Sequence, residues 1–261
     1  MHMKLPSHAV VEPNIKKDAP VIELDGLTHS YAYGGETVLH DLNLAIPRGE
    51  IFGFLGHNGA GKTTTISILT TLLRQTAGAA RIAGFDTVSE ADEVRRRIGY
   101  LPENVTFYND LTAYENLAYF ARLSGVKNVD ERIDEVLGFL DFRGIEHRKL
   151  KTFSKGMRQR IGLAQAILHE PEVVFLDEPT TGLDPVGIKN LRDVILRLNQ
   201  EKGMTIFMNT HLLSEVSKTC TSIGVLNRGR LIYNESLEKT LADFPDEVSL
   251  EAIYVQMEEL V

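Results

Sequence analysis

Short apolar segments alternate along most of the chain with segments whose apolar residues recur at helical spacing. The apolar segments predict strands at Val21–Leu27, Val38–Ile46, Ile51–Leu55, Ala80–Ala83, Ile98–Leu101, Val173–Leu176, Met204–Met208, Ile223–Leu226 and Leu231–Tyr233. The helical spacing predicts a helix from Thr63 onward and further helices at Glu90–Arg97, Thr112–Leu123, Asp130–Leu140, Gly156–His169, Val186–Asn199 and Leu212–Thr219, then two short helices between Leu237 and Leu260. Strands that alternate with helices indicate an α/β fold with a mainly parallel sheet.

Some regions depart from this alternation. The stretch from about Glu103 to His169 is mostly helical and predicts an inserted α-helical subdomain. The strands before Gly56 predict an added antiparallel β-subdomain. His29 to Gly35 is interpreted as a turn with two exposed tyrosines. Residues 1–19 show no periodicity and predict a flexible tail, and residues 20–261 are expected to form the folded domain.

Composition and charge exclude several classes of protein. The net charge of the 261 residues is -8, whereas a nucleic-acid-binding surface usually carries a basic excess. Cys220 is the only cysteine, which excludes an internal disulfide and a cysteine zinc cluster. No apolar run approaches the ~18–20 residues of a membrane-spanning helix, and the N-terminus lacks the apolar core of a signal peptide. We therefore expect a cytoplasmic protein, which can still dock onto a membrane protein.

The segment IFGFLGHNGAGKTTTISIL, residues 51–69, combines a buried strand, a glycine-rich loop and a helix. This order is the context in which G-x-x-x-x-G-K-[ST] indicates a phosphate-binding loop. Glycines let backbone N–H groups approach a phosphate, and the helix N-terminus adds partial positive charge. Lys62 is placed to reach the β- and γ-phosphates, and the Thr63 hydroxyl to bind Mg²⁺. A glycine-rich turn without a ligand is the alternative, which the Lys62-Thr63 pair disfavours.

A second buried strand, Val173–Leu176, is followed by Asp177 and Glu178. Ligands of open α/β sheets bind at the carboxyl ends of the strands, so we expect both carboxylates beside the glycine-rich loop. Asp177 would hold Mg²⁺, and Glu178 would stand where a general base for water is needed. Without the loop, the same pair could be a solvated strand end.

Two further features have a structural and a functional interpretation. Ser154 begins the turn FSKGMRQ, which on its own is a helix N-cap. Its hydroxyl, its backbone N–H groups and the helix N-terminus would also suit a phosphate. His211 follows a strand and, taken alone, could be a histidine that bonds to the backbone at a helix start.

Together, these motifs resemble those of the nucleotide-binding subunit of an ATP-binding cassette (ABC) transporter, from Val21 to about Tyr233. GHNGAGKT is similar to the family's Walker A loop, VVFLDEP to its Walker B strand, FSKGM to its LSGGQ signature and TTGLDP to its D-loop segment. His211 matches the switch histidine. Tyr31 matches the aromatic residue on which adenine stacks, with Tyr33 as the alternative.

The resemblance implies an ATPase with the P-loop NTPase fold that uses ATP and Mg²⁺. The residues expected to bind the nucleotide are Tyr31, Gly56, His57, Asn58, Gly59, Ala60, Gly61, Lys62, Thr63 and Thr64. The residues expected to bind the metal are Thr63, Glu103 and Asp177. Glu178 would polarise the attacking water, and His211 would contact the γ-phosphate and hold Glu178.

The resemblance further implies that one chain contains only half of each complete site. Two subunits would dimerise head to tail, as a homodimer or a heterodimer. The signature residues of one subunit, Ser154, Lys155, Gly156 and Met157, would then cover the ATP of the other. Asp184 would link the two sites. Closure on ATP and opening on hydrolysis would drive a separate integral membrane permease, at the cytoplasmic face of the cell membrane.

Three positions depart from the family pattern. Glu103 stands where a glutamine is usual, which adds a negative charge near Mg²⁺. Lys155 replaces the first glycine of the signature, and we expect its side chain to be solvated rather than a phosphate ligand. His57 replaces a common proline and is expected to be neutral, because that position mainly contributes its backbone.

Other segments suggest a branch of the family. GYLPEN, ENLAYFARLSG and SKGM resemble the subfamily that serves ABC-2 type exporters, and GHNGAGKT with PENVTFY resembles the ATPase of nitrous oxide reductase copper-site maturation. A soluble ABC ATPase of translation or DNA repair is the alternative. It is disfavoured by the single cassette, the acidic charge and the lack of sustained heptads between Lys62 and Ser154. A scaffold with an inactive site is disfavoured by the intact Lys62, Asp177, Glu178 and His211.

Overall fold

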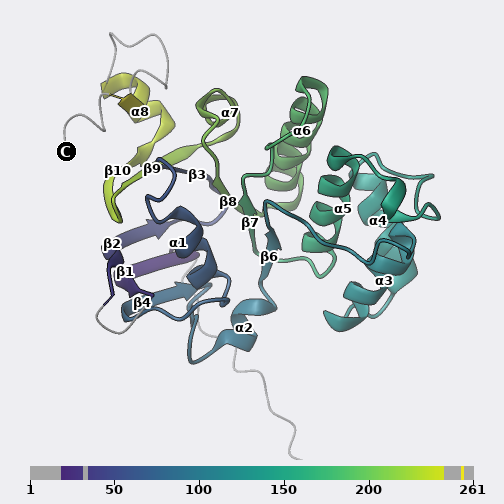
Figure 1. Ribbon diagram of the computed structural model, residues 1–261, viewed down its shortest axis with the longest axis horizontal. Helices are drawn as coiled ribbons and strands as arrows, with labels where there is room; N and C mark the ends of the chain where they lie inside the picture. The colour runs from purple at the N-terminus through teal and green to yellow at the C-terminus, as the bar shows by residue number, and fades with distance from the viewer. Residues whose placement is uncertain (1–18, 32–34, 244–253, 256–261) are drawn as a thin grey trace, which may run out of the picture.

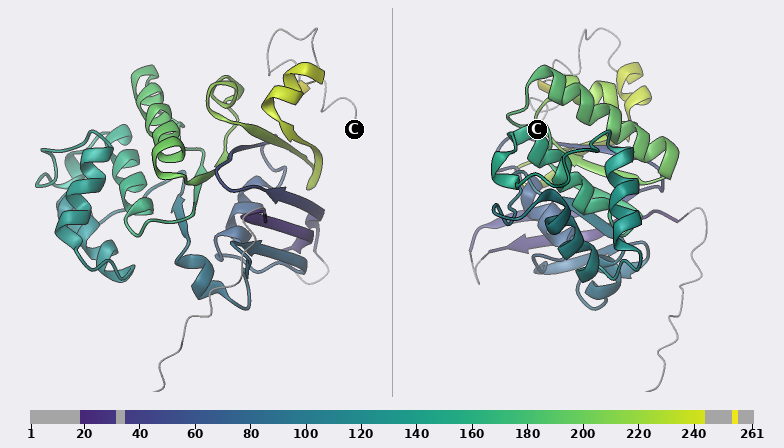
Figure 2. Two further views of the ribbon diagram at one scale, coloured as in Figure 1. Left: turned by 180° about the vertical axis from the view of Figure 1, so that it is seen from behind. Right: turned by 90° about the vertical axis from the view of Figure 1, so that its right-hand side faces the viewer.

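The computed structural model describes residues 19–31, 35–243 and 254–255, which form two sheets and a group of helices (Figure 1). Helices α3 (Ala113–Leu123), α4 (Val129–Phe139) and α5 (Lys155–Ile167) lie together at one end of the molecule. The four-stranded sheet lies at the opposite end, and the view from behind shows the same arrangement (Figure 2). None of the helices that the structure describes combines the length and apolar character needed to cross a bilayer.

The six-stranded sheet carries the candidate chemistry. Its order is β10-β9-β3-β8-β7-β6, with β10 antiparallel to β9 and the other neighbours parallel. The strands are β3 (Ile51–Leu55), β6 (Ile98–Leu101), β7 (Val173–Asp177), β8 (Thr205–Asn209), β9 (Ser222–Asn227) and β10 (Arg230–Ser236). Because β3, β7 and β8 run in the same direction, the loops that follow them meet at one edge of the sheet. The predicted mainly parallel sheet is confirmed.

The second sheet is antiparallel throughout, as predicted for the added β-subdomain, with the order β2-β1-β4-β5. Its strands are β1 (Ile22–Ser30), β2 (Thr37–Ile46), β4 (Ala77–Ile82) and β5 (Phe85–Asp86). The turn expected to begin at His29 begins too early in the prediction, because β1 continues through Ser30 and His29 lies opposite Leu39 of β2. The expected exposure of Tyr31 is confirmed. The strand expected at Ala80–Ala83 begins at Ala77 and pairs with β1.

Helices cover both faces of the six-stranded sheet. The remaining helices are α1 (Lys62–Leu69), α2 (Ala91–Arg95), η1 (Leu150–Thr152), α6 (Pro185–Lys202), α7 (Leu213–Thr219) and α8 (Leu237–Asp243). Helix α1 contacts strands of both sheets and so lies between them. Side chains cap the N-termini of several helices, among them Thr112 at α3, Ser154 at α5 and Asp184 at α6.

One apolar core lies on each face of the six-stranded sheet. Strand β3 divides its side chains between them: Phe52 and Phe54 pack toward α1 and the antiparallel sheet, whereas Ile51 and Leu55 pack toward the helical end. All five residues of β3 are buried. The sheet thus holds the glycine-rich loop that follows β3 between two packed layers.

Part of the predicted organisation lies outside the described residues. This is true of residues 1–18 of the expected tail and of most of the second helix expected before Leu260; α8 and the helical residues Tyr254 and Val255 are described. The expected division into a folded domain from residue 20 and a helical subdomain at about 103–169 stays a prediction.

Candidate functional site

The loop between β3 and α1 turns on glycines. Gly59 and Gly61 have φ angles of 85° and 109°, in the left-handed region that favours glycine. A Cβ atom at Gly61 would also lie 2.5 Å from the Leu39 side chain, so a larger residue would not fit. A backbone without side chains at these positions lets an anion approach the N-terminus of α1.

Lys62, the first residue of α1, folds back into this loop. Its ammonium donates hydrogen bonds to the carbonyl oxygens of Gly56 at 2.5 Å and His57 at 3.1 Å. Its side chain is buried. The lysine charge is therefore held inside the loop, next to the surface that an incoming phosphate would meet.

The ring of His57 connects the same loop to β9. Its ring Nδ1 lies 2.7 Å from the carbonyl oxygen of Asn58, and Nε2 lies 3.3 Å from Oδ1 of Asn227, the last residue of β9. The ring contacts the protein rather than projecting into the loop. This supports the expectation that position 57 contributes mainly through its backbone.

Tyr31 connects the end of β1 to helix α1. Its hydroxyl lies 2.8 Å from the hydroxyl of Thr64, while the side chain as a whole is 65% exposed. Thr63, one residue earlier on α1, is exposed. An exposed aromatic face thus lies beside the first turn of the helix, whereas the alternative residue, Tyr33, lies outside the described residues.

Asp177 ends β7, opposite Asn209 at the end of β8. The Asn209 amide donates a hydrogen bond of 2.5 Å to Oδ1 of Asp177, whose exposed fraction is 6%. Burial raises the pKa of Asp177, and the negative charges of Glu178 and Glu103 raise it further. The hydrogen bond from Asn209 and the positive charge of Lys62 act in the opposite direction and lower the pKa. Sequence reasoning missed Asn209, although its position one residue after the expected strand could have indicated it.

Glu178 has an unusual backbone and a defined partner. Its φ angle is 47°, rare for a residue with a side chain, and its N–H donates to the carbonyl oxygen of Asn209 at 2.9 Å. Its Oε2 lies 2.8 Å from Nδ1 of His211. The two residues follow neighbouring strands, so the predicted pair comes together as expected.

Several of these groups line a common cleft of about 360 Å³, whereas Tyr31, His57 and His211 are not among its lining residues. The residues that line it are Val38, Asn58, Gly59, Gly61, Lys62, Thr63, Thr64, Glu103, Asp177, Glu178 and Asn209. Ala60 is buried beneath the loop. The hydroxyl of Thr63 and the carboxylates of Glu103 and Asp177 are oxygen donors of the kind that Mg²⁺ prefers, so this donor set fits the metal.

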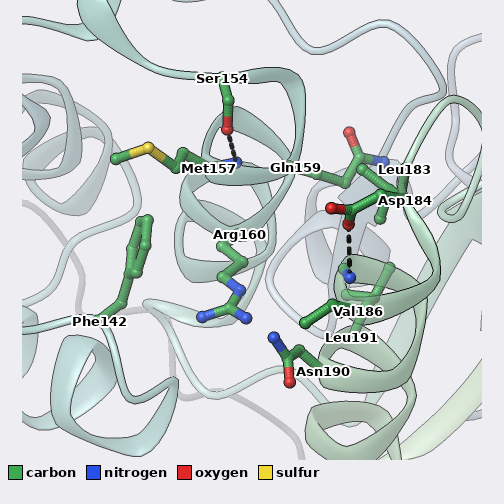
Figure 3. A pocket seen from close by; sticks show the side chains of 12 residues that line it. Phe142, Ser154, Met157, Gln159, Arg160, Leu183, Asp184, Val186, Asn190 and Leu191 are labelled. Atoms are coloured by element: carbon green, nitrogen blue, oxygen red, sulfur yellow. Dashed lines mark hydrogen bonds between the residues drawn. The ribbon is translucent and has the colours of Figure 1, made fainter.

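The signature residues lie in a second pocket, of about 280 Å³ (Figure 3). It is lined by Phe142, Ser154, Gly156, Met157, Gln159, Arg160, Leu183, Asp184, Val186, Gly187, Asn190 and Leu191. Ser154 accepts a hydrogen bond from the Met157 N–H at 3.3 Å, and Asp184 accepts one from the Gly187 N–H at 2.7 Å. Both side chains therefore cap the helices that form the pocket.

The two pockets have no lining residue in common. The phosphate-facing groups belong to the first, and Ser154, Gly156, Met157 and Asp184 to the second. Lys155 is exposed, and its side chain lies across Gly182. Within one chain, the signature residues do not line the cleft of the glycine-rich loop.

Comparison with known proteins decides the family. The profile of the family described as ABC transporter matches residues 39–181, more than half of the chain. The chain belongs to the ABC transporter family. The predicted fold class of a P-loop ATPase with an antiparallel and a helical addition is confirmed. The chain is the ATP-binding and ATP-hydrolysing subunit of an ABC transporter.

Relatives of this ABC subunit include two Bacillus proteins. It is 45% identical over 227 residues to the ABC transporter ATP-binding protein YhcH of Bacillus subtilis, covering 87% of this chain and 73% of YhcH. It is 43% identical over 203 residues to the bacitracin transport ATP-binding protein BcrA of Bacillus licheniformis, covering 77% of this chain and 65% of BcrA.

A solved structure shares the architecture. The dimeric, post-hydrolysis ATP-binding cassette MJ0796, bound to ADP and Pi, superposes with a TM-score of 0.75 at 27% identity, covering 83% of this chain and 98% of that one. The narrower likeness to the ATPase of nitrous oxide reductase maturation stays a prediction.

Proposed function

We propose that two copies of this ABC subunit, or one copy and a related subunit, close head to tail over two ATP molecules. The observation that carries the proposal is the separation of the signature pocket from the phosphate-facing cleft. Ser154 and Gly156 can cover an ATP bound at Lys62 only if they come from another subunit. The dimeric state of the related cassette MJ0796 supports this arrangement.

Each complete site would then consist of residues from two chains. The loop N–H groups, Lys62 and Thr64 would bind the phosphates, and Tyr31 would stack on the base. Thr63, Glu103 and Asp177 would hold Mg²⁺, which neutralises phosphate charge when bound. Glu178, oriented by His211, would accept a proton from the attacking water. From the other chain, Ser154 and the N-terminus of α5 would face the γ-phosphate, and Asp184 would link the sites.

We further propose that closure and opening drive an integral membrane permease of the ABC-2 exporter type, with the subunit attached at the cytoplasmic face of the membrane. The 43% identity to BcrA, a bacitracin transport protein, supports this branch. The permease residues would determine the transported substrate. We propose no nucleic-acid partner, because the chain carries a net charge of -8.

Mixing two inactive variants tests the shared site. Lys62→Ala removes the phosphate-binding ammonium, and Ser154→Arg blocks the signature pocket, so each variant alone should be inactive. A mixed dimer still contains one intact site, made from the Lys62 of one chain and the Ser154 of the other. If homodimers form, mixing should restore about a quarter of the wild-type rate, as twofold symmetry requires.

The same mixture also gives the result that would contradict the head-to-tail proposal. If the mixture stays as inactive as either variant, although both variants fold and bind each other, the head-to-tail arrangement is wrong. Mixing two different samples of Lys62→Ala, with no second variant, is the matched control and should restore nothing.

A further inference from the structure

His29 is a buried polar residue of the antiparallel sheet. Its exposed fraction is 4%, and it lies in β1 opposite Leu39, within the antiparallel sheet. Neither of its ring nitrogens has a hydrogen-bond partner among the described residues. An unpaired buried polar atom is destabilising, so an apolar residue would suit this position better for stability alone.

The ring of His29 packs against the aromatic ring of Tyr31. The ring centroids are 4.8 Å apart and the planes meet at 89°, an edge-to-face contact. His29 lies within β1 and Tyr31 directly follows its end, so the ring contact connects the residue beyond the strand to the sheet. His29 is the buried member of the pair, and Tyr31 is 65% exposed.

Tyr31 is also held at its other end. Its hydroxyl lies 2.8 Å from that of Thr64, which is buried in the first turn of α1, two residues after Lys62. A continuous series of contacts therefore runs from the sheet core, through His29 and Tyr31, to the helix that begins at the phosphate-binding loop. An exposed side chain fixed at both ends loses little rotamer freedom when a ligand binds to it.

We propose that His29 is a positioning residue for nucleotide binding: it holds the Tyr31 ring in the orientation that stacks on the base. This inference rests on the proposed role of Tyr31 as the base platform. The His29 ring itself is too buried to contact the nucleotide. Its effect should therefore appear in the affinity for ligands that carry a base and should be absent for ligands that carry only phosphates.

Calorimetric titration of the full chain with ATP and with inorganic tripolyphosphate, both with Mg²⁺, tests the proposal. His29→Leu keeps an apolar core residue but removes the flat ring, and His29→Phe keeps a flat ring and removes both unpaired nitrogens. We expect His29→Leu to weaken ATP binding about five- to tenfold, part of the full value of base stacking, and to leave tripolyphosphate binding unchanged. His29→Phe should bind ATP as the wild type does and melt at a higher temperature.

A double-mutant cycle separates positioning from a general structural effect. Tyr31→Ala should weaken ATP binding, and adding His29→Leu to it should weaken binding no further. Tyr119→Ala, at an exposed tyrosine that does not line the cleft, is the matched control for Tyr31→Ala. If His29→Leu does not fold, His29→Met repeats the test with a flexible apolar side chain.

Three results would overturn the inference: unchanged ATP affinity in His29→Leu, equal losses for ATP and tripolyphosphate, or full additivity with Tyr31→Ala. Failure of the proposed function looks different. In that case Lys62→Ala would leave the affinity for both ligands unchanged, whatever His29 does.

Discussion

Nδ1 of His211 lies 2.8 Å from Oε2 of Glu178. The carboxylate is the more buried partner, with 14% of its side chain exposed against 57% for the histidine. Glu178 is also fixed by its backbone, whose φ of 47° turns the residue away from the line of β7. The imidazole therefore holds this carboxylate together with the Thr181 hydroxyl, which donates to the same oxygen at 3.4 Å.

The first prediction concerns this pair. His211→Ala should lower kcat by about a hundredfold, the lower end of what a general base contributes, because Glu178 loses the group that orients it. KM for ATP should change little, since the phosphate-binding loop is intact. Steady-state phosphate release gives both constants. A variant with the wild-type kcat would show that His211 does not position Glu178.

The ionised carboxylate of Asp177 should lower the free energy of unfolding. Its pKa is raised in the folded protein, mainly by burial, so at neutral pH the ionised carboxylate costs folding free energy. Asp177→Asn removes the charge and can still accept the hydrogen bond from Asn209. Without nucleotide and Mg²⁺, we expect the variant to be about 1 kcal/mol more stable and to melt about 2–4 °C higher at pH 7.

The pH dependence of this difference is the control. A group with a raised folded pKa binds its proton earlier in the folded state as the pH falls. Wild-type Asp177 therefore becomes neutral as the pH drops through its raised pKa, and the gap between the two melting temperatures should close. A gap that widens at acid pH would contradict this explanation.

Glu103→Gln should retain ATPase activity. The amide oxygen remains a donor for Mg²⁺, and the cleft loses one of its three carboxylates, Glu103, Asp177 and Glu178. With fewer negative charges, ATP should bind more tightly at low Mg²⁺ concentration. Turnover and ATP affinity, each measured across a Mg²⁺ series, test both points. A collapse of turnover at normal ATP affinity would mean that the carboxylate is essential.

Lys155→Gly should keep turnover within about threefold of the wild type, as expected for an exposed side chain away from the reacting atoms. Its Nζ would lie 2.7 Å from a Cβ placed on Gly182, so the lysine covers the turn before Asp184 but does not line the signature pocket. Ser154→Arg is the matched control and should abolish turnover. A loss of turnover in Lys155→Gly as large as that in the control would show that the lysine acts on ATP.

Most of the fold could be predicted from local pattern. The pattern predicts Ile51–Leu55 with its observed bounds because four apolar residues, Ile51, Phe52, Phe54 and Leu55, precede a glycine-rich loop. The pairing of β4 with β1 could not be predicted, because Ala77–Ile82 is rich in alanine and has little period-two signal. The two residues of β5 are too few to give any pattern.

The parts of the candidate site that could be predicted are the residues that directly follow a predicted strand or glycine-rich loop. Lys62, Thr63, Asp177 and Glu178 follow buried strands, and parallel strands bring such positions to one edge. The contacts of Asn209 and His29 depend on which strands are neighbours and which way a side chain points. An aromatic and polar run such as His29 to Gly35 looks like a turn until the partner strand, with Leu39, buries its first residue.

The decisive measurement is the rate of phosphate release with ATP for the wild type and for Glu178→Gln, each in complex with the permease. We expect turnover by the wild type and a loss of at least about a hundredfold in Glu178→Gln, with ATP affinity unchanged. Equal rates for the two proteins, or no hydrolysis by either, would contradict it.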